Sequence, residues 1–115
     1  DIPLLNLQHF IFNANQPEHR MHYILARITV KPEAAAAAAT ILAELAAQTR
    51  KEAGCVQYAV YHQEQSPHIF QTVEHWQSKA DADAHMTTPH VGAAFAAAGP
   101  LLAGAPEILA YTKLA

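Results

Sequence analysis

The sequence predicts one α+β domain whose elements run in the order strand, helix, strand, strand, helix, strand. Two observations carry this prediction. A long alanine-rich helix separates the first strand from the second, and the six residues 63–68 between the second and third strands leave room only for a hairpin loop. This order is the split βαβ arrangement, in which a four-stranded antiparallel sheet carries its helices on one face.

The first half of the domain alternates a clear strand with a clear helix. Tyr23–Lys31 is rich in Ile, Val and Thr, and both of its faces are apolar, which predicts a strand covered on both sides. Pro32 then opens a helix that is expected to run to about Glu52, because proline suits the first helical turn and alanines favour the helix interior. Gly54 is predicted to end this helix as a cap.

The second half begins with two strands, Cys55–His62 and Ile69–Trp76, and returns to helix at Ser78. Ser78 with Asp81 resembles a capping box, which predicts a short helix beyond it. A second short helix is expected from Thr88-Pro89 to Gly99-Pro100, with Val91, Phe95 and Ala98 on its apolar stripe. The last strand is predicted at Ile108–Leu114.

Composition restricts the classes of function. The 115 residues suit one domain, and no apolar run approaches the roughly 20 residues of a membrane span. A net charge of −3 with scattered basic residues gives no footprint for nucleic acid or an anionic membrane. The single cysteine, Cys55, excludes an internal disulfide and favours a cytoplasmic location. Residues 1–20 lack the regular strand and helix pattern of the domain at 21–115. They are interpreted as an N-terminal arm or as added sequence.

The sheet face away from the helices is expected to bury its apolar side chains in a homodimer. Leu25, Ile108 or Leu109, and Tyr111 contribute to that face, and no further element of the predicted domain covers it. A second copy of the chain would supply the cover, which predicts dimerisation through the open sheet face.

One strand-to-helix connection brings together Glu74, His85 and His90, the predicted catalytic residues. His85 falls at the end of the first short helix, where imidazolium is favoured, and His90 at the start of the next, where neutral imidazole is favoured. These opposite preferences predict His90 as a base and His85 as an acid. Alternatively, both histidines cap helices, and Glu74 makes a structural hydrogen bond or an ion pair between subunits with Arg27 or Arg50. Five-residue spacing across Pro89 argues against a metal site.

The residue pattern resembles a known family over about Met21 to Leu114. The resemblance rests on three motifs: Glu52-x-Gly54-Cys55-x-x-Tyr58, Glu74-x-Trp76 and Ala84-His85-x-x-Thr88-Pro89-His90. They are similar to the antibiotic biosynthesis monooxygenase (ABM) superfamily, and the last is similar to bacterial quinol monooxygenases and to isomerases that process phosphorylated autoinducer-2. The resemblance implies a ferredoxin-like fold, a dimeric α+β barrel, and cofactor-free oxidation in some members.

Haem breakdown, another activity of that superfamily, is not expected. Where haem-degrading members have Asn, Trp and His, this chain has Ala26, His85 and Phe95. No cofactor or metal is therefore predicted.

The predicted activity is that of a cofactor-independent monooxygenase that oxidises a small electron-rich phenol or quinol with O₂. Proton transfer from a phenol to a histidine is uphill by about 5 kcal/mol, so a cation near the phenolate is needed, and His85 or Arg27 could supply it. The expected substrate contacts are Tyr58, Trp76, Arg27 and Phe95, although Tyr58 and Trp76 also fit the core. The alternatives are an acid–base isomerase of a small carbonyl compound and a non-catalytic dimer that binds a small ligand.

Overall fold

The structure, a computed structural model, describes residues 20–115 and confirms the predicted fold class. The predicted arm over residues 1–20 lies outside the described residues except for Arg20. The elements in chain order are β1 (His22–Thr29), η2 (Pro32–Ala34), α2 (Ala35–Thr49), β2 (Cys55–His62), β3 (Ile69–Trp76), α3 (Lys79–His85), α4 (Pro89–Ala98), η3 (Gly99–Leu101) and β4 (Glu107–Tyr111). Here η marks one turn of 3₁₀ helix.

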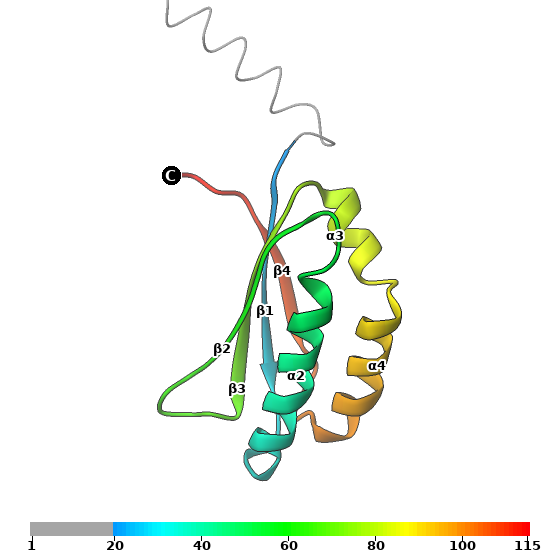
Figure 1. Cartoon of the computed structure of the whole chain (residues 1–115). Helices are drawn as coiled ribbons and strands as arrows, with labels where there is room; N and C mark the ends of the chain where they lie inside the picture. The colour runs from blue at the N-terminus through cyan, green and yellow to red at the C-terminus, as the bar shows by residue number, and fades with distance from the viewer. Residues whose placement is uncertain (1–19) are drawn as a thin grey trace, which may run out of the picture.

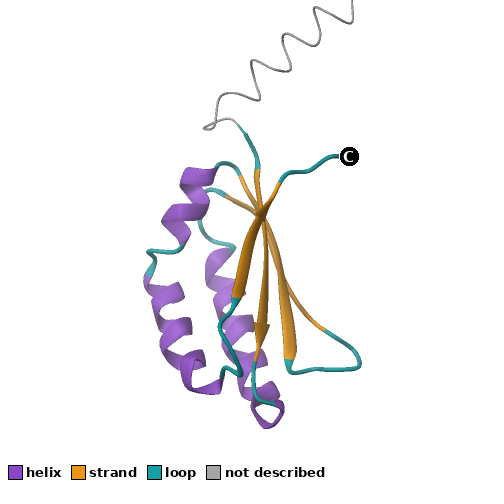
Figure 2. Ribbon diagram, turned by 180° about the vertical axis from the view of Figure 1, so that it is seen from behind, coloured by secondary structure: helices purple, strands orange, loops and turns teal. Residues whose placement is uncertain are grey.

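The four strands form one antiparallel sheet in the order β2-β3-β1-β4. β1 lies inside the sheet, where Ile24 pairs with Glu74 of β3 on one side and with Ala110 of β4 on the other. The helices α2, α3 and α4 all lie on one side of this sheet (Figure 1), and the view from behind shows the same two layers (Figure 2). The fold is therefore the expected two-layer, ferredoxin-like one.

Local capping explains where the two short helices begin. The Ser78 hydroxyl accepts a hydrogen bond from the Asp81 backbone N–H at 3.1 Å, and the Thr88 hydroxyl accepts one from the Val91 N–H at 3.4 Å. Both caps were expected from the sequence, and each satisfies a backbone donor that the first helical turn leaves without a partner. They also fix His85 at the end of α3, close to the start of α4.

Gly54 serves a different purpose from the predicted one. Helix α2 ends earlier, at Thr49, and no described glycine has a positive φ, so the expected left-handed cap at Gly54 is wrong. Instead, a Cβ atom at Gly54 would overlap the Asp81 side chain at the start of α3. Glycine is needed here because two segments approach closely, and the chain between α2 and β2 passes directly beside α3.

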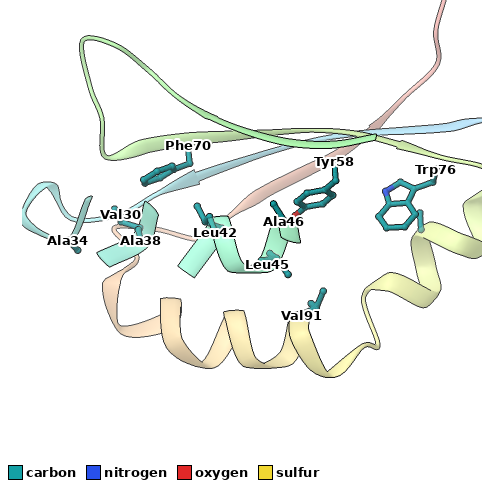
Figure 3. Packing of buried hydrophobic residues seen from close by; sticks show 11 residues of the cluster. Val30, Ala34, Ala38, Leu42, Leu45, Ala46, Tyr58, Phe70, Trp76 and Val91 are labelled. Atoms are coloured by element: carbon teal, nitrogen blue, oxygen red, sulfur yellow. The ribbon is translucent and has the colours of Figure 1, made fainter. Parts of the chain in front are cut away.

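The core fills the space between the sheet and the helices. Phe70 and Trp76 of β3 and Tyr58 of β2 point toward the helices, where Leu42 of α2 and Val91 of α4 meet them (Figure 3). Small residues of α2 such as Ala38 and Ala46 belong to the same cluster. Because alanine side chains are short, they let the α2 backbone lie close to the sheet.

The opposite face of the sheet is apolar and open. Leu25 pairs with Val73 on one side and with Leu109 on the other, and Tyr23 pairs with Tyr111, so these side chains form a continuous band across three strands. Leu109 and Tyr111 are nearly half exposed, and no described element covers them. In residues 20–115, no helix combines the length and apolar character that crossing a bilayer requires.

Candidate active site

A small cavity lies between the sheet and helix α4. Its volume is about 70 Å³, and most of its lining is apolar, with side chains from β1, α2, α4 and β4. Such a volume exceeds the roughly 10–15 Å³ that one water needs and is less than the ~150 Å³ of a cavity known to hold benzene, so an aromatic ligand would require lining side chains to move apart. Four polar residues line it: Tyr58, Thr72, Glu74 and His85. The cavity is thus an apolar chamber with a few polar groups on its wall.

His85 is the buried histidine of this wall. It ends helix α3, is only 4 % exposed, and packs its ring against Trp76 and Tyr58 with centroid distances of 4.7 and 5.6 Å. Its Nδ1 lies 2.7 Å from Oε2 of Glu52. An ionised carboxylate only accepts hydrogen bonds, so Nδ1 carries a proton and donates it to Glu52. In the neutral ring, Nε2 then holds the lone pair.

Glu52 joins both histidines through one oxygen. Its Oε2 also lies 2.7 Å from Nε2 of His90, the second residue of α4. Glu52 stands in the turn between α2 and β2, in the segment where Gly54 allows close approach to α3. It does not line the cavity, whereas His85 does. The Glu52 carboxylate therefore orients the His85 ring without lining the cavity itself. Nε2 of His85 makes no hydrogen bond to any of residues 20–115.

Tyr58 places a neutral hydroxyl on the same wall. Burial raises the pKa of this phenol far above its ordinary value, and the nearby Glu74 carboxylate raises it further. The group therefore keeps its proton at any physiological pH. Within the described chain its hydroxyl has no hydrogen-bond partner, and its ring centroid lies 5.6 Å from that of His85. An apolar chamber with one acceptor and one donor suits a small ligand that carries a hydroxyl.

Both carboxylate oxygens of Glu74 accept hydrogen bonds from side chains of its own strand. Its Oε2 accepts a hydrogen bond from the Thr72 hydroxyl at 2.7 Å, and its Oε1 accepts one from the Trp76 indole N–H at 3.0 Å. The Thr72 oxygen in turn accepts the Ala26 backbone N–H at 3.1 Å. Glu74 was predicted to be catalytic, by orienting a histidine or a substrate hydroxyl; it bonds neither histidine, and the hydrogen bonds seen are the structural ones of the alternative interpretation. Glu74 lines the cavity as a carboxylate whose oxygens already have donors.

The other predicted site residues divide into those near the cavity and those away from it. Phe95 lines the cavity, as expected for a substrate contact. Trp76 does not line it and is fully buried, which fits the core alternative. Arg27 follows Ala26, which lines the cavity, and successive strand residues alternate in direction, so Arg27 points to the open sheet face. It therefore cannot supply a cation to the cavity of its own chain.

His90 also lies outside the cavity lining. Its ring contacts Glu52, with Nε2 at 2.7 Å from Oε2. The assignment of His90 as the base that meets the substrate thus does not fit the geometry, since His85 alone of the two reaches the chamber. The alternative that both histidines cap helices is not what is observed either, because Thr88 caps α4 and both rings bind a side chain.

Sequence reasoning missed Glu52 and Met86. Glu52 was visible only as part of a motif, without a role, because its partners lie 33 and 38 residues further along the chain. The one local signal was a carboxylate two residues before a glycine at a helix-to-strand turn. Met86 directly follows His85 and lines the cavity, but a methionine at a helix end carries no chemical signal.

Comparison with known proteins shows which family the chain resembles in sequence and structure. The family model described as antibiotic biosynthesis monooxygenase matches residues 21–97. PA3566 of Pseudomonas aeruginosa is similar at 30 % identity and a TM-score of 0.77, covering 83 % of this chain and 95 % of its own. A conserved protein of Methanosarcina mazei is 28 % identical with a TM-score of 0.77, and the match covers 85 % of this chain and 97 % of that one.

A Caulobacter crescentus protein assigned to the antibiotic biosynthesis monooxygenases is also 28 % identical, with a TM-score of 0.79 and coverage of 90 % and 99 %. No protein of curated function matches the chain in sequence. The family match covers most of the domain, from β1 through nearly all of α4, and includes Glu52, His85 and His90. The chain belongs to the antibiotic biosynthesis monooxygenase family.

Proposed function

We propose that this protein is a cofactor-independent monooxygenase that oxidises a small electron-rich phenol or quinol with O₂. The observation that supports the proposal most directly is the arrangement of His85. One of its ring nitrogens donates to Glu52 at 2.7 Å, and the ring itself lines an apolar cavity. A buried imidazole that a carboxylate orients from behind is the usual arrangement of a general base.

The proposed reaction begins when Nε2 of His85 takes the hydroxyl proton of the substrate. The phenolate gives one electron to O₂, and the resulting radical and superoxide combine at a ring carbon to form a C–O bond. The His85 imidazolium returns its proton to the peroxide anion. The O–O bond then breaks, the leaving hydroxide takes the ring C–H proton as water, and a carbonyl remains. One oxygen atom of O₂ stays in the quinone product and the other becomes water. All electrons come from the substrate, so the scheme needs no bound redox cofactor.

The energetics depend on stabilising the charge pair that the first step creates. Proton transfer between an ordinary phenol and an ordinary histidine is uphill by about 5 kcal/mol. In this site the new imidazolium would lie 2.7 Å from the Glu52 carboxylate. The Tyr58 hydroxyl would donate a hydrogen bond to the phenolate oxygen, because its pKa is raised and it stays protonated. Preorganised groups of this kind act more strongly beside apolar side chains than they do in water.

The alternative isomerase function keeps the same base but uses no oxygen. Among the residues that line the cavity there is no arginine or lysine, so a phosphorylated substrate has no cation to bind there. The third alternative, a ligand-binding module without catalysis, would use the chamber and leave His85 without a chemical role. Oxygen consumption distinguishes the monooxygenase from both.

We also propose that the protein acts as a homodimer through the open sheet face. The apolar band formed by Leu25, Val73 and Leu109 supports this, since a second copy offers an identical band to cover it. The dimer would close the sheet into the barrel that the family resemblance implies.

The test replaces His85 by glutamine and measures O₂ uptake with a panel of hydroquinones. We expect H85Q to lower kcat by roughly two to four powers of ten, the usual contribution of a positioned base. E52Q should lower kcat as well, because an amide holds the ring less firmly and does not stabilise imidazolium. The matched control is H68Q, which alters a histidine in the loop between β2 and β3. Parent-like turnover by H85Q would contradict the proposal.

A further inference from the structure

Glu52, His85 and His90 together form a set of donors that can hold a metal ion. Each contributes one donor atom, and the three atoms lie within 4.8 Å of one another. The spacing of the histidines along the chain argued against such a site, but the fold supplies the third donor from the turn between α2 and β2, 33 residues before His85. We propose that these three residues bind a divalent cation of the zinc and cobalt type, and that the bound ion switches off the base in the cavity.

The present distances are those of hydrogen bonds. Oε2 of Glu52 is 2.7 Å from Nδ1 of His85 and 2.7 Å from Nε2 of His90. Zinc binds such donors at about 2.0–2.2 Å, which places neighbouring donors about 3–3.5 Å apart. Conversion thus needs side-chain movements on the order of 1 Å.

The burial pattern shows which side chains can make these movements. The His85 side chain is 6 % exposed, whereas those of Glu52 and His90 are 17 % and 22 % exposed. The first donor is therefore fixed by the core, while the other two lie nearer the surface, where an ion can enter. A water molecule can complete the coordination from that side.

The donor types select the class of ion. Two imidazoles and one carboxylate suit zinc, cobalt, nickel and ferrous iron, whereas magnesium and calcium prefer sites made only of oxygen donors. One carboxylate with two neutral rings leaves a net positive centre, so we expect moderate affinity and reversible binding. Reversible binding distinguishes the proposed site from a structural zinc centre, which keeps its ion permanently.

Metal binding changes the tautomer of His85. Without the ion, Nδ1 carries the proton and Nε2 of this cavity-lining ring has the lone pair. With the ion on Nδ1, the single proton of the neutral ring must sit on Nε2. The cavity then meets an N–H donor in place of an acceptor, and Glu52 is no longer available to stabilise an imidazolium. This loss of the base rests on the proposed function, whereas binding of the ion rests on the donor geometry alone.

The binding test titrates untagged, dialysed protein with cobalt(II) chloride and follows visible absorption together with calorimetry. We expect one ion per chain and the absorption of a site with nitrogen and oxygen ligands. E52Q and H90Q should each weaken binding at least about tenfold, which corresponds to ~1.4 kcal/mol. His90 is partly exposed, so H90Q tests the site even if E52Q folds poorly. H68Q should bind as the parent does.

Equal affinity of the parent, E52Q and H90Q would overturn the inference and assign the ion to surface histidines. Turnover gives a separate readout. Hydroquinone oxidation should fall in proportion to bound cobalt and return on chelation. If one ion binds through these residues and turnover is unaffected, the role of His85 as the base fails while the metal site stands. If H90Q binds cobalt like the parent while H85Q is inactive, the metal site fails and the base stands.

Discussion

Glu52 accepts two hydrogen bonds through a single oxygen, one from each histidine. This fixes the tautomer of both rings at once, because a carboxylate offers no proton in return. At the residue scale, the site therefore depends on an acid whose side chain does not line the cavity. Glu74, by contrast, lines the cavity but spends both oxygens on Thr72 and Trp76. A carboxylate can thus line the cavity while its oxygens already have hydrogen-bond donors within the protein.

Thr49 provides a residue-scale prediction about stability. Its side chain is fully buried at the end of α2, and its hydroxyl has no hydrogen-bond partner among the described residues. Valine has nearly the same shape without the unpaired oxygen. We expect T49V to raise the free energy of unfolding by about 1 kcal/mol, since an unpaired buried hydroxyl costs ~1–3 kcal/mol. T49S keeps the hydroxyl and loses a buried methyl group, so urea unfolding should show a decrease of about 1 kcal/mol. A drop in stability for T49V would reveal a hidden partner for the hydroxyl.

The sequence predicted residue types better than residue partnerships. His85 and Tyr58 were identified because histidine and tyrosine carry recognisable chemistry, and both line the cavity. The bond from Glu52 to His85 could not be predicted, because it depends on how closely the turn before β2 approaches α3. Helix-end arguments assigned His90 the role of base, but they describe only the backbone near a ring and not the direction in which the ring points.

At the scale of elements, the caps of α3 and α4 set the geometry of the site. These helices were predictable because Ser78, Thr88 and Pro89 act locally, within one turn. The extent of α2 was less predictable: it ends at Thr49 instead of near Glu52. The early end has a functional result, because it frees Glu52 from the helix so that its side chain can reach both histidines.

Two glycines give a matched prediction at this scale. Gly92 lies in α4 with no atom near its missing Cβ, whereas a Cβ at Gly54 would overlap Asp81. G92A should therefore raise the free energy of unfolding by about 0.5–1 kcal/mol, because alanine favours the helix. G54A should lower it by about 1–3 kcal/mol, because α3 must shift to make room. Thermal and urea unfolding would measure both, and a stable G54A would contradict the close approach that places Glu52.

At the scale of the whole molecule, the two faces of the sheet have different surroundings. The helices lie over one face of the sheet (Figure 2), and the cavity lies on that side. The other face carries an apolar band that the described chain leaves open. This asymmetry was predictable from the sequence, because both faces of the strands are apolar and the helices can cover only one. The depth and lining of the cavity were not, since they depend on the exact distance between α4 and the sheet.

The open face predicts a dimer that one charge can disrupt. The parent should sediment as a dimer at micromolar concentration, with an interface of at least ~1,200 Å². Leu109 is 46 % exposed in the single chain, so L109K leaves the chain's own core intact while it places a charge in the band. We expect L109K to sediment as a folded monomer. The control A93K changes the exposed side of α4 and should stay dimeric. A monomeric parent would contradict the proposed assembly.

The wall that α4 contributes to the cavity includes Ala94 and Ala98, while the polar groups come from the strands and from the end of α3. Shape and reactivity therefore reside on separate pieces of the backbone. Exchange of these methyl-sized side chains would change the size of the cavity and leave His85 and Glu52 in place. Helix α4 is therefore the element to alter when the aim is to change which molecules fit.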